Sequence, residues 1–114
     1  MLPAKIDTRD LRGKARLRSP AHRAWVREHM CVVPGCANMP IEAMHVRRAA
    51  TSGIGFKPSD AYCASGCREH HSECHRIGEK SFEAKYKIDL MALAREFYER
   101  SPFRGRLDNP WGAQ

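Results

Sequence analysis

Four cysteine and histidine side chains have the spacing of a metal site. Four residues separate Cys31 from Cys36, and two separate Cys67 from His70. The shorter spacing lets a loop or the first turn of a helix direct two ligands at one tetrahedral ion. A proline and a glycine between the first two cysteines favour a knuckle that turns both thiolates to the same side. The sequence therefore predicts a structural zinc site with three cysteine ligands and one histidine ligand.

Three further histidines are left free for chemistry. His71 and His75 are four residues apart, so on a helix they share a face and can hold a second ion. His45 stands by itself, and a neutral imidazole near pH 7 can take a proton from water. His22 and His29 have no partner at metal spacing, and we expect them to pack or to lie at the surface.

Composition indicates one small basic domain. The chain has 114 residues, a net charge of +7 and only 8% aromatic residues, so a metal would help to hold its small core together. The charge favours a polyanionic partner, nucleic acid first, over the alternative of a merely basic protein. No stretch reaches the roughly 20 apolar residues of a membrane span. Five cysteines without an export signal indicate thiols and metal ligands in a reducing cytosol rather than disulfides.

Three segments are expected along the chain. They are a basic flexible arm over residues 1–18, a zinc-containing domain over residues 19–100 and a loose tail over residues 101–114. The arm has six lysines and arginines against two aspartates, among them Lys14, Arg16 and Arg18. Such an arm is either solvated or in contact with phosphates, and both can hold because it can order when DNA arrives.

Caps and periodicity predict the elements that carry the first histidine. Ser19 and Pro20 begin a helix that runs to about residue 29. A strand of mixed apolar and polar character over residues 41–47 carries His45 near its end. A loop over residues 51–58 and a second strand over residues 61–64 follow.

The second half of the chain is predicted to be helical. A turn at residues 65–66 leads into the helix that carries the second histidine pair, and this helix ends at Gly78. Ser81 caps the last helix, whose apolar residues recur at steps of three and four as a core-facing stripe, and which stops before Pro102. The stripe consists of Phe82, Tyr86, Leu90, Leu93 and Phe97.

This order of knuckle, strand, loop, strand and histidine-bearing helix resembles that of the HNH endonucleases over roughly residues 19–100. The resemblance implies an α+β fold, with a small zinc-stapled ββα-metal core flanked by an N-terminal helix and a long C-terminal helix. Within that group the chain resembles the phage recombination-enhancement (Ref-type) nucleases and related phage HNH proteins. The segments that carry this narrower likeness are Ser19-Pro20, Trp25-Val26-Arg27, His45-Val46-Arg47, Lys57-Pro58-Ser59-Asp60 and the run from Cys67 to His75.

The resemblance implies a metal-dependent DNA endonuclease and gives roles to single residues. His45 matches the general base that acts on water. His71 and His75 match the ligands of one catalytic divalent ion, magnesium or manganese. Asp60 stands near the acidic or amide residue that orients the loop or the base. The structural zinc ligands of the family match Cys31, Cys36, Cys67 and His70.

Cationic side chains near these segments would contact the DNA backbone. Arg47, Arg48 and Arg68 could clamp phosphates that flank the scissile bond, because guanidinium groups bind phosphate in a bidentate manner. The basic arm would extend this contact. Cleavage by the implied mechanism leaves 5′-phosphate and 3′-hydroxyl ends.

One position departs from the family pattern. Many HNH enzymes carry an aspartate or a histidine just before the base as a third metal ligand, where this chain has Met44, which cannot serve a hard ion. Glu42 and Asp60 are the acidic residues that could substitute for it. Cys63 and Cys74 are expected to be small buried hydrophobes, and Cys63 is an alternative zinc ligand.

A second function fits part of the pattern, namely a non-catalytic zinc-stapled module for DNA binding or recombination. Three histidines beside a complete zinc site favour the nuclease, whereas the methionine favours the module. A two-cysteine, two-histidine zinc finger is excluded, because far more than about 12 residues separate Cys36 from His71. The narrower resemblance alone implies a recombinase filament as a further partner and a bacterial or phage-infected cytoplasm as the compartment.

Overall fold

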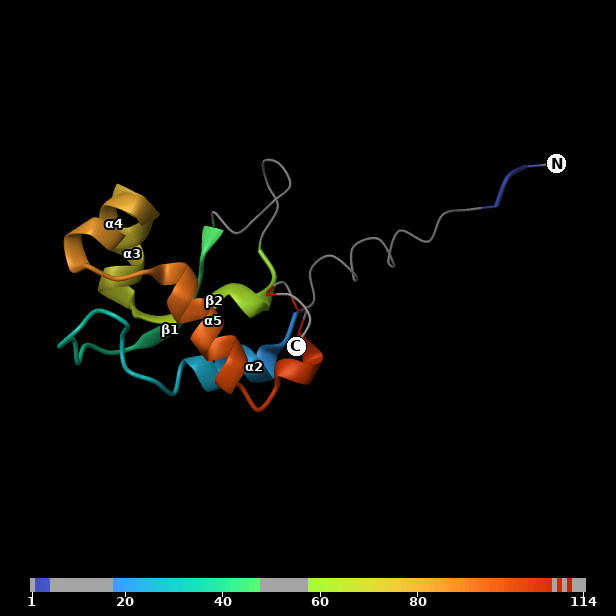
Figure 1. Ribbon diagram of the computed structural model, residues 1–114, viewed down its shortest axis with the longest axis horizontal. Helices are drawn as coiled ribbons and strands as arrows, with labels where there is room; N and C mark the ends of the chain where they lie inside the picture. The colour runs from blue at the N-terminus through green and yellow to red at the C-terminus, as the bar shows by residue number, and fades with distance from the viewer. Residues whose placement is uncertain (1, 5–17, 48–57, 108, 110, 112–114) are drawn as a thin grey trace.

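The computed structural model describes residues 2–4, 18–47, 58–107, 109 and 111 of the chain. None of the helices within these residues is long and apolar enough to cross a membrane. The fold is α+β, as the resemblance implied, with the order strand, strand, helix at its centre (Figure 1). The elements are α2 (Pro20–Val26), β1 (Ile41–His45), η2 (Asp60–Tyr62), β2 (Cys63–Cys67), α3 (Arg68–Ile77), α4 (Glu79–Tyr86), α5 (Leu90–Arg100) and η3 (Arg104–Arg106).

The two strands form an antiparallel pair that separates two chemical centres. His45 lies opposite Cys63 at one end of the pair, and Ile41 lies opposite Cys67 at the other. All five residues of β2 are buried. α2 packs against both strands, and α5 packs against β2 and η2. The predicted zinc ligand Cys67 and the predicted base His45 are therefore held at opposite ends of one covered sheet.

The hydrophobic core is small and includes predicted zinc ligands. Phe82 of α4 and Leu90 of α5 are at most 1% exposed, and they pack in one cluster with Met44 of β1. Cys31 and Cys67 belong to the same cluster. Apolar packing and the predicted zinc site therefore form one structural unit.

The last helix differs from its prediction. A single helix from Ser81 is wrong, because the chain forms α4 from Glu79 and then a separate α5. Lys87 adopts a left-handed conformation with φ of 57° and ends α4. Asp89 then starts α5 by accepting a hydrogen bond from the backbone N–H of Ala92. The apolar stripe continues across the break, which is why periodicity alone did not reveal it.

The strands and α2 are also bounded differently. The second strand was predicted over residues 61–64, whereas β2 spans Cys63–Cys67 and includes Gly66, which was predicted in a turn. A Cβ atom at Gly66 would lie 3.1 Å from the sulfur of Met44, so the close approach of the neighbouring strand uses the missing side chain. The first strand ends two residues earlier than predicted, and α2 ends at Val26 rather than near residue 29.

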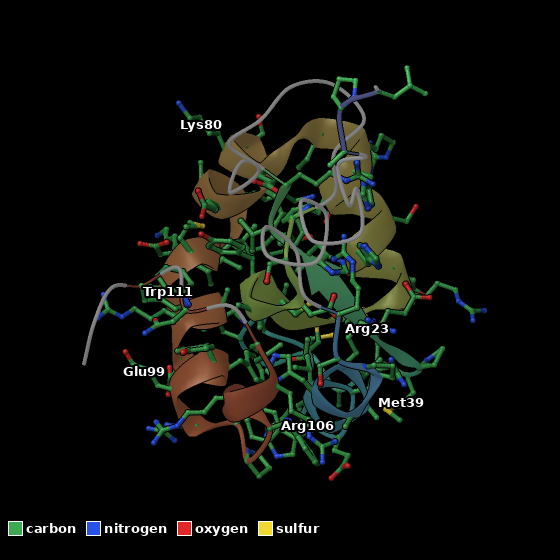
Figure 2. The ribbon with its side chains drawn as sticks, turned by 90° about the vertical axis from the view of Figure 1, so that its right-hand side faces the viewer. Arg23, Met39, Lys80, Glu99, Arg106 and Trp111 are labelled. Atoms are coloured by element: carbon green, nitrogen blue, oxygen red, sulfur yellow. The ribbon has the colours of Figure 1, made fainter. Side chains whose placement is uncertain are left out.

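Residues after α5 make contacts that an unattached tail would lack. Ser101 and Leu107 are buried. The ring of Trp111 lies beside α5, 5.1 Å from the ring of Tyr62 (Figure 2). His22 is fully buried, and its Nδ1 lies 2.8 Å from the hydroxyl oxygen of Ser101, which confirms that His22 is a packing residue.

Candidate metal centres and active site

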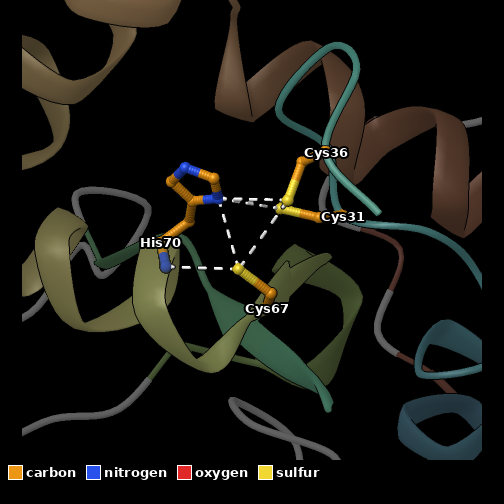
Figure 3. A group of neighbouring side chains, drawn as sticks. All are labelled: Cys31, Cys36, Cys67 and His70. Carbon is orange, nitrogen blue, oxygen red and sulfur yellow. Dashed lines mark hydrogen bonds between the residues drawn. The ribbon is translucent and has the colours of Figure 1, made fainter. Parts of the chain in front are cut away.

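The knuckle, the end of β2 and the start of α3 bring four potential zinc ligands together. The Nδ1 atom of His70 lies 3.5 Å from the sulfur of Cys31, 3.4 Å from that of Cys36 and 3.2 Å from that of Cys67 (Figure 3). The sulfurs of Cys36 and Cys67 are 4.0 Å apart. A tetrahedron with metal–sulfur bonds of about 2.3 Å has edges of about 3.8 Å, so these separations fit one Zn²⁺.

Backbone hydrogen bonds explain why these ligands converge. The N–H of Val32 donates to the carbonyl of Ser65 at 3.0 Å, and the N–H of Arg68 donates to the carbonyl of Pro40 at 3.1 Å. The first bond ties the knuckle to β2, and the second ties the residue before β1 to the first residue of α3. Burial raises the pKa of the Cys31 thiol to about 11, so this thiol needs a bound cation to ionise near neutral pH.

The remaining cysteines lie outside this cluster. Cys63 lies instead with His45 and Asp60, with the potential ligand atoms of all three within 4.8 Å of one another. This placement does not support Cys63 as an alternative zinc ligand in the cysteine cluster. Cys63 and Cys74 are both buried, as expected for small hydrophobes.

A second centre forms where α3 passes the far end of β1. A cavity of about 160 Å³ is lined by His45, His71 and His75 together with Arg47 and Pro58. A larger cavity of about 480 Å³ shares the three histidines and continues toward the start of α4. The structure thus brings together the three histidines that the sequence left free.

The histidine pair on α3 has the geometry of two neighbouring metal ligands. The Nε2 atoms of His71 and His75 are 3.0 Å apart. Two adjacent ligands of an octahedral ion with bonds of about 2.1 Å are about 3.0 Å apart. The Nδ1 of His71 lies 2.7 Å from Oε1 of Glu42. Because an ionised carboxylate only accepts hydrogen bonds, this contact places a proton on Nδ1 and leaves Nε2 free to bind a metal.

Charge near the pair favours the states that bind a metal. The hydrogen bond from His71 lowers the pKa of Glu42, which keeps that carboxyl ionised. Burial lowers the pKa of His75, and the nearby His71 and Arg47 lower it further. A neutral imidazole is the form that ligates metals.

Asp60 fixes the orientation of His45. The Nε2–H of His45 donates to Oδ1 of Asp60 over 2.8 Å, which leaves Nδ1 as the unprotonated nitrogen. Asp60 is fully buried. Burial raises the pKa of its carboxyl, but hydrogen bonds from His45 and from the Ser19 backbone and the charge of Arg23 outweigh burial and bring the pKa down to about 2. The carboxylate therefore stays ionised.

A comparison with known families gives a separate observation. A family model described as "Putative HNHc nuclease" matches residues 13–96, which is most of the chain. The protein belongs to the HNH nuclease family. No curated protein and no solved structure matches the chain. Membership of this family implies a DNA substrate and a divalent metal ion.

In this member of the HNH family, the structure places a buried Met44 where many members have a metal ligand. Met44 is 2% exposed and packs in the core. Glu42 contacts Nδ1 of His71, and Asp60 contacts Nε2 of His45. Neither carboxylate therefore takes the place of the third metal ligand that Met44 lacks. Among the described residues, His71 and His75 belong to no group of three or more clustered ligand side chains.

The predicted DNA contacts stay predictions, and the structure shows where three of these arginines lie. Arg47 is exposed and lines the cavity. Arg68 is exposed and lies 3.6 Å from Oε2 of Glu42. Arg18 donates to the carbonyl of Pro58 and lies 3.3 Å from Oδ1 of Asp60, so it supports the buried carboxylate instead of extending along the arm. The remaining predicted contacts, which lie outside the described residues, are Lys14, Arg16 and Arg48.

Sequence reasoning missed Arg23. Its guanidinium contacts Oδ2 of Asp60, 37 residues further along the chain. The only sequence signal was a basic residue one turn into a helix capped by Ser19, which is common on exposed helix faces.

Proposed function

We propose that this HNH protein is a metal-dependent DNA endonuclease that hydrolyses phosphodiester bonds, with His45 as general base and one divalent ion held by His71 and His75. The observation that carries the proposal is the shared cavity of these three histidines. Two of these histidines also contact a carboxylate, since Nε2 of His45 lies at Asp60 and Nδ1 of His71 lies at Glu42. Both contacts support the same assignment. A Zn²⁺ held by the three cysteines and His70 would serve the fold.

The chain's own groups account for activation of water. Asp60 holds the proton on Nε2 of His45, so Nδ1 can accept a proton from a water molecule in the cavity. The oxygen of that water forms a bond to phosphorus while the bond from phosphorus to the 3′ oxygen breaks, and the leaving 3′ oxygen takes a proton from a second water molecule. The products are a 5′-phosphate and a 3′-hydroxyl. Arg47, which lines the same cavity, would contact the phosphate.

The two imidazole ligands, His71 and His75, influence which divalent ion the site prefers. When bound, a divalent ion would compensate charge on the scissile phosphate and on the leaving oxygen. Two imidazoles suit manganese better than magnesium, which prefers oxygen ligands. Glu42 would keep His71 in the tautomer that binds metal. We therefore expect higher activity with Mn²⁺ than with Mg²⁺ at equal concentration.

A plasmid-nicking assay tests the function. The zinc-loaded protein is expected to nick DNA with Mn²⁺ or Mg²⁺ and to stop when EDTA removes the divalent ion. His45→Ala should lose about a hundredfold to ten-thousandfold in rate while keeping the fold, the zinc content and the DNA affinity. His29→Ala is the matched control, because His29 lies outside the cavity. A His45→Ala protein that releases zinc yet nicks normally would make His45 structural.

The buried Met44 favours a second candidate, a non-catalytic zinc-stapled module for DNA binding or recombination. Such a module would bind DNA but nick it under none of the metal conditions. It would also show no Mn²⁺ binding that depends on His75. Calorimetric titration of Mn²⁺ into the wild type and His75→Ala separates the two candidates.

We further propose a phage-type, recombination-linked role in the cytoplasm of a bacterium or an infected host, supported by the resemblance to Ref-type nucleases. The substrate would then be DNA coated by a recombinase filament. Nicking of recombinase-coated DNA should exceed nicking of naked DNA of the same sequence. Equal rates on the two substrates would remove the filament from the proposal.

A further inference from the structure

The start of α2 holds the carboxylate that contacts His45. The backbone N–H of Ser19 donates to Oδ2 of Asp60 over 2.7 Å, and Nη1 of Arg23 donates to the same oxygen. Figure 2 labels Arg23, whose side chain is 29% exposed, whereas that of Asp60 is fully buried. One oxygen of Asp60 is thus held from α2, and the other receives the Nε2–H of His45.

The cationic partners of Asp60 keep its buried carboxylate ionised and fix its orientation. A buried carboxylate without cationic partners is costly, so it would take up a proton or turn toward other donors. Arg23 supplies both a charge and a hydrogen bond on the side away from His45. Arg18 is a weaker support, because its guanidinium is 3.3 Å from Oδ1 and also contacts the carbonyl of Pro58.

We propose that Arg23 is a positioning residue of the nuclease, which acts through Asp60 on His45. By holding Oδ2, Arg23 keeps Oδ1 directed at Nε2 of His45 and so keeps Nδ1 as the nitrogen that accepts the proton. The helix α2, which lies outside the strand, strand, helix unit, thereby becomes part of the active site. This inference rests on the proposed function, because it requires His45 to be the base.

Steady-state nicking kinetics test the inference. Arg23→Met should lower kcat by roughly 10- to 100-fold and leave KM for DNA within about twofold, because a displaced base loses alignment and not substrate affinity. Arg23→Lys should recover most of kcat, because the contact to Oδ2 uses a single nitrogen. Arg27→Met is the matched control, since it removes the same charge from an exposed position at the end of the same helix.

A spectroscopic readout separates positioning from loss of fold. Long-range ¹H–¹⁵N spectra of neutral His45 should show the proton on Nε2 in the wild type and in Arg23→Lys. In Arg23→Met they should show a mixture of both tautomers. Zinc content should stay at the wild-type level in all three proteins.

Each outcome decides the question. Wild-type kcat in Arg23→Met, equal losses in Arg23→Met and Arg27→Met, or an unchanged tautomer would each overturn the role of Arg23. If Arg23→Met does not fold, Arg23→Gln takes its place with the same expected loss of kcat. Failure of both uncharged variants to fold would make Arg23 structural and overturn the proposal. An active His45→Ala protein would instead refute the proposed function itself.

Discussion

At the residue scale, the chemistry of two of the histidines in the cavity depends on the carboxylate that each contacts through one ring nitrogen. His45 contacts Asp60, and His71 contacts Glu42. In both pairs the carboxylate determines which ring nitrogen carries the proton. The two histidines can therefore have different roles, one accepting a proton and the other binding an ion, although their side chains are identical.

Because the Asp60 carboxylate is buried and ion-paired, we expect the stability of the fold to depend on pH in the acid range. The pKa of Asp60 falls from 3.8 to about 2 on folding. A lowered carboxyl pKa contributes stability that is fully present above about pH 4 and is lost as the pH falls toward 2. The contribution at pH 7 is about 2 kcal/mol. Asp60→Asn should lower the free energy of unfolding at pH 7 and flatten its decline between pH 4 and pH 2, as measured by urea denaturation.

A matched substitution controls for the loss of one carboxyl group. Asp89→Asn changes an exposed residue at the start of α5, where asparagine caps as well as aspartate. This variant should keep the acid dependence of the wild type. An identical decline in Asp60→Asn and the wild type would show that the Asp60 ion pairs contribute nothing to stability.

At the element scale, the predicted zinc site joins three segments that also share one small core. Its ligands come from the knuckle, from the last residue of β2 and from the first turn of α3. The aromatic rings of Phe82 and Tyr86 cover His70 from α4. A metal here would link these elements to the small core.

Removal of one zinc ligand should therefore destabilise the whole fold. Protein purified without added metal is expected to carry about one equivalent of zinc, which elemental analysis measures. Cys31→Ser should lower the zinc content and the Tm together. Cys74→Ser, a change at a buried cysteine outside the cluster, should keep the zinc. Unchanged zinc content and Tm in Cys31→Ser would show that Cys31 is not a ligand.

The break between α4 and α5 gives a second prediction at this scale. Lys87 has φ of 57°, a conformation that costs a residue with a side chain more than it costs glycine. Lys87→Gly should raise the free energy of unfolding by about 0.5 to 1 kcal/mol. Ala84→Gly, at an exposed position inside α4, should lower it by about 1 kcal/mol. If chemical denaturation shows that Lys87→Gly is less stable than the wild type, the left-handed conformation at Lys87 is not a source of strain.

At the scale of the whole molecule, a net charge of +7 favours binding to DNA through its phosphates. Arg18 forms an ion pair with Asp60, so we do not count it among the residues that bind DNA phosphates. Residues 1–17 contain five lysines and arginines and can be removed without touching that ion pair.

Deletion of residues 1–17 should weaken DNA binding and flatten its salt dependence. The slope of log affinity against log salt should fall by about 0.9 for each phosphate that the truncated protein no longer neutralises. Fluorescence anisotropy with a labelled duplex at several salt concentrations measures the slope. The truncated protein should keep its zinc and its Tm, whereas deletion of residues 1–18 should also lower the Tm. An unchanged slope would exclude the arm from the DNA interface.

The sequence by itself determined the features that depend on short spacing. The zinc pairs, the α3 histidines, the Ser19 cap and the end of α3 at Gly78 all involve residues within five positions of one another, and such distances are fixed by local backbone geometry. The order of these features, through the family resemblance, also indicated the α+β fold, and it gave the proposed role of His45.

Only the tertiary structure decided the partners of the candidate active-site residues. Arg23 and Asp60 are 37 residues apart, and Glu42 and His71 are 29 apart. Such pairs meet because the strand register and the packing of α2 and α3 on the sheet place them together, and no local pattern encodes that. The sequence did not reveal the helix break at Lys87 for a related reason. The apolar stripe continues from α4 into α5, and both helices pack their part of it against the same core. Spacing along the chain thus predicted which residues are candidates for chemistry, and packing decided which nitrogen of His45 and of His71 meets a carboxylate.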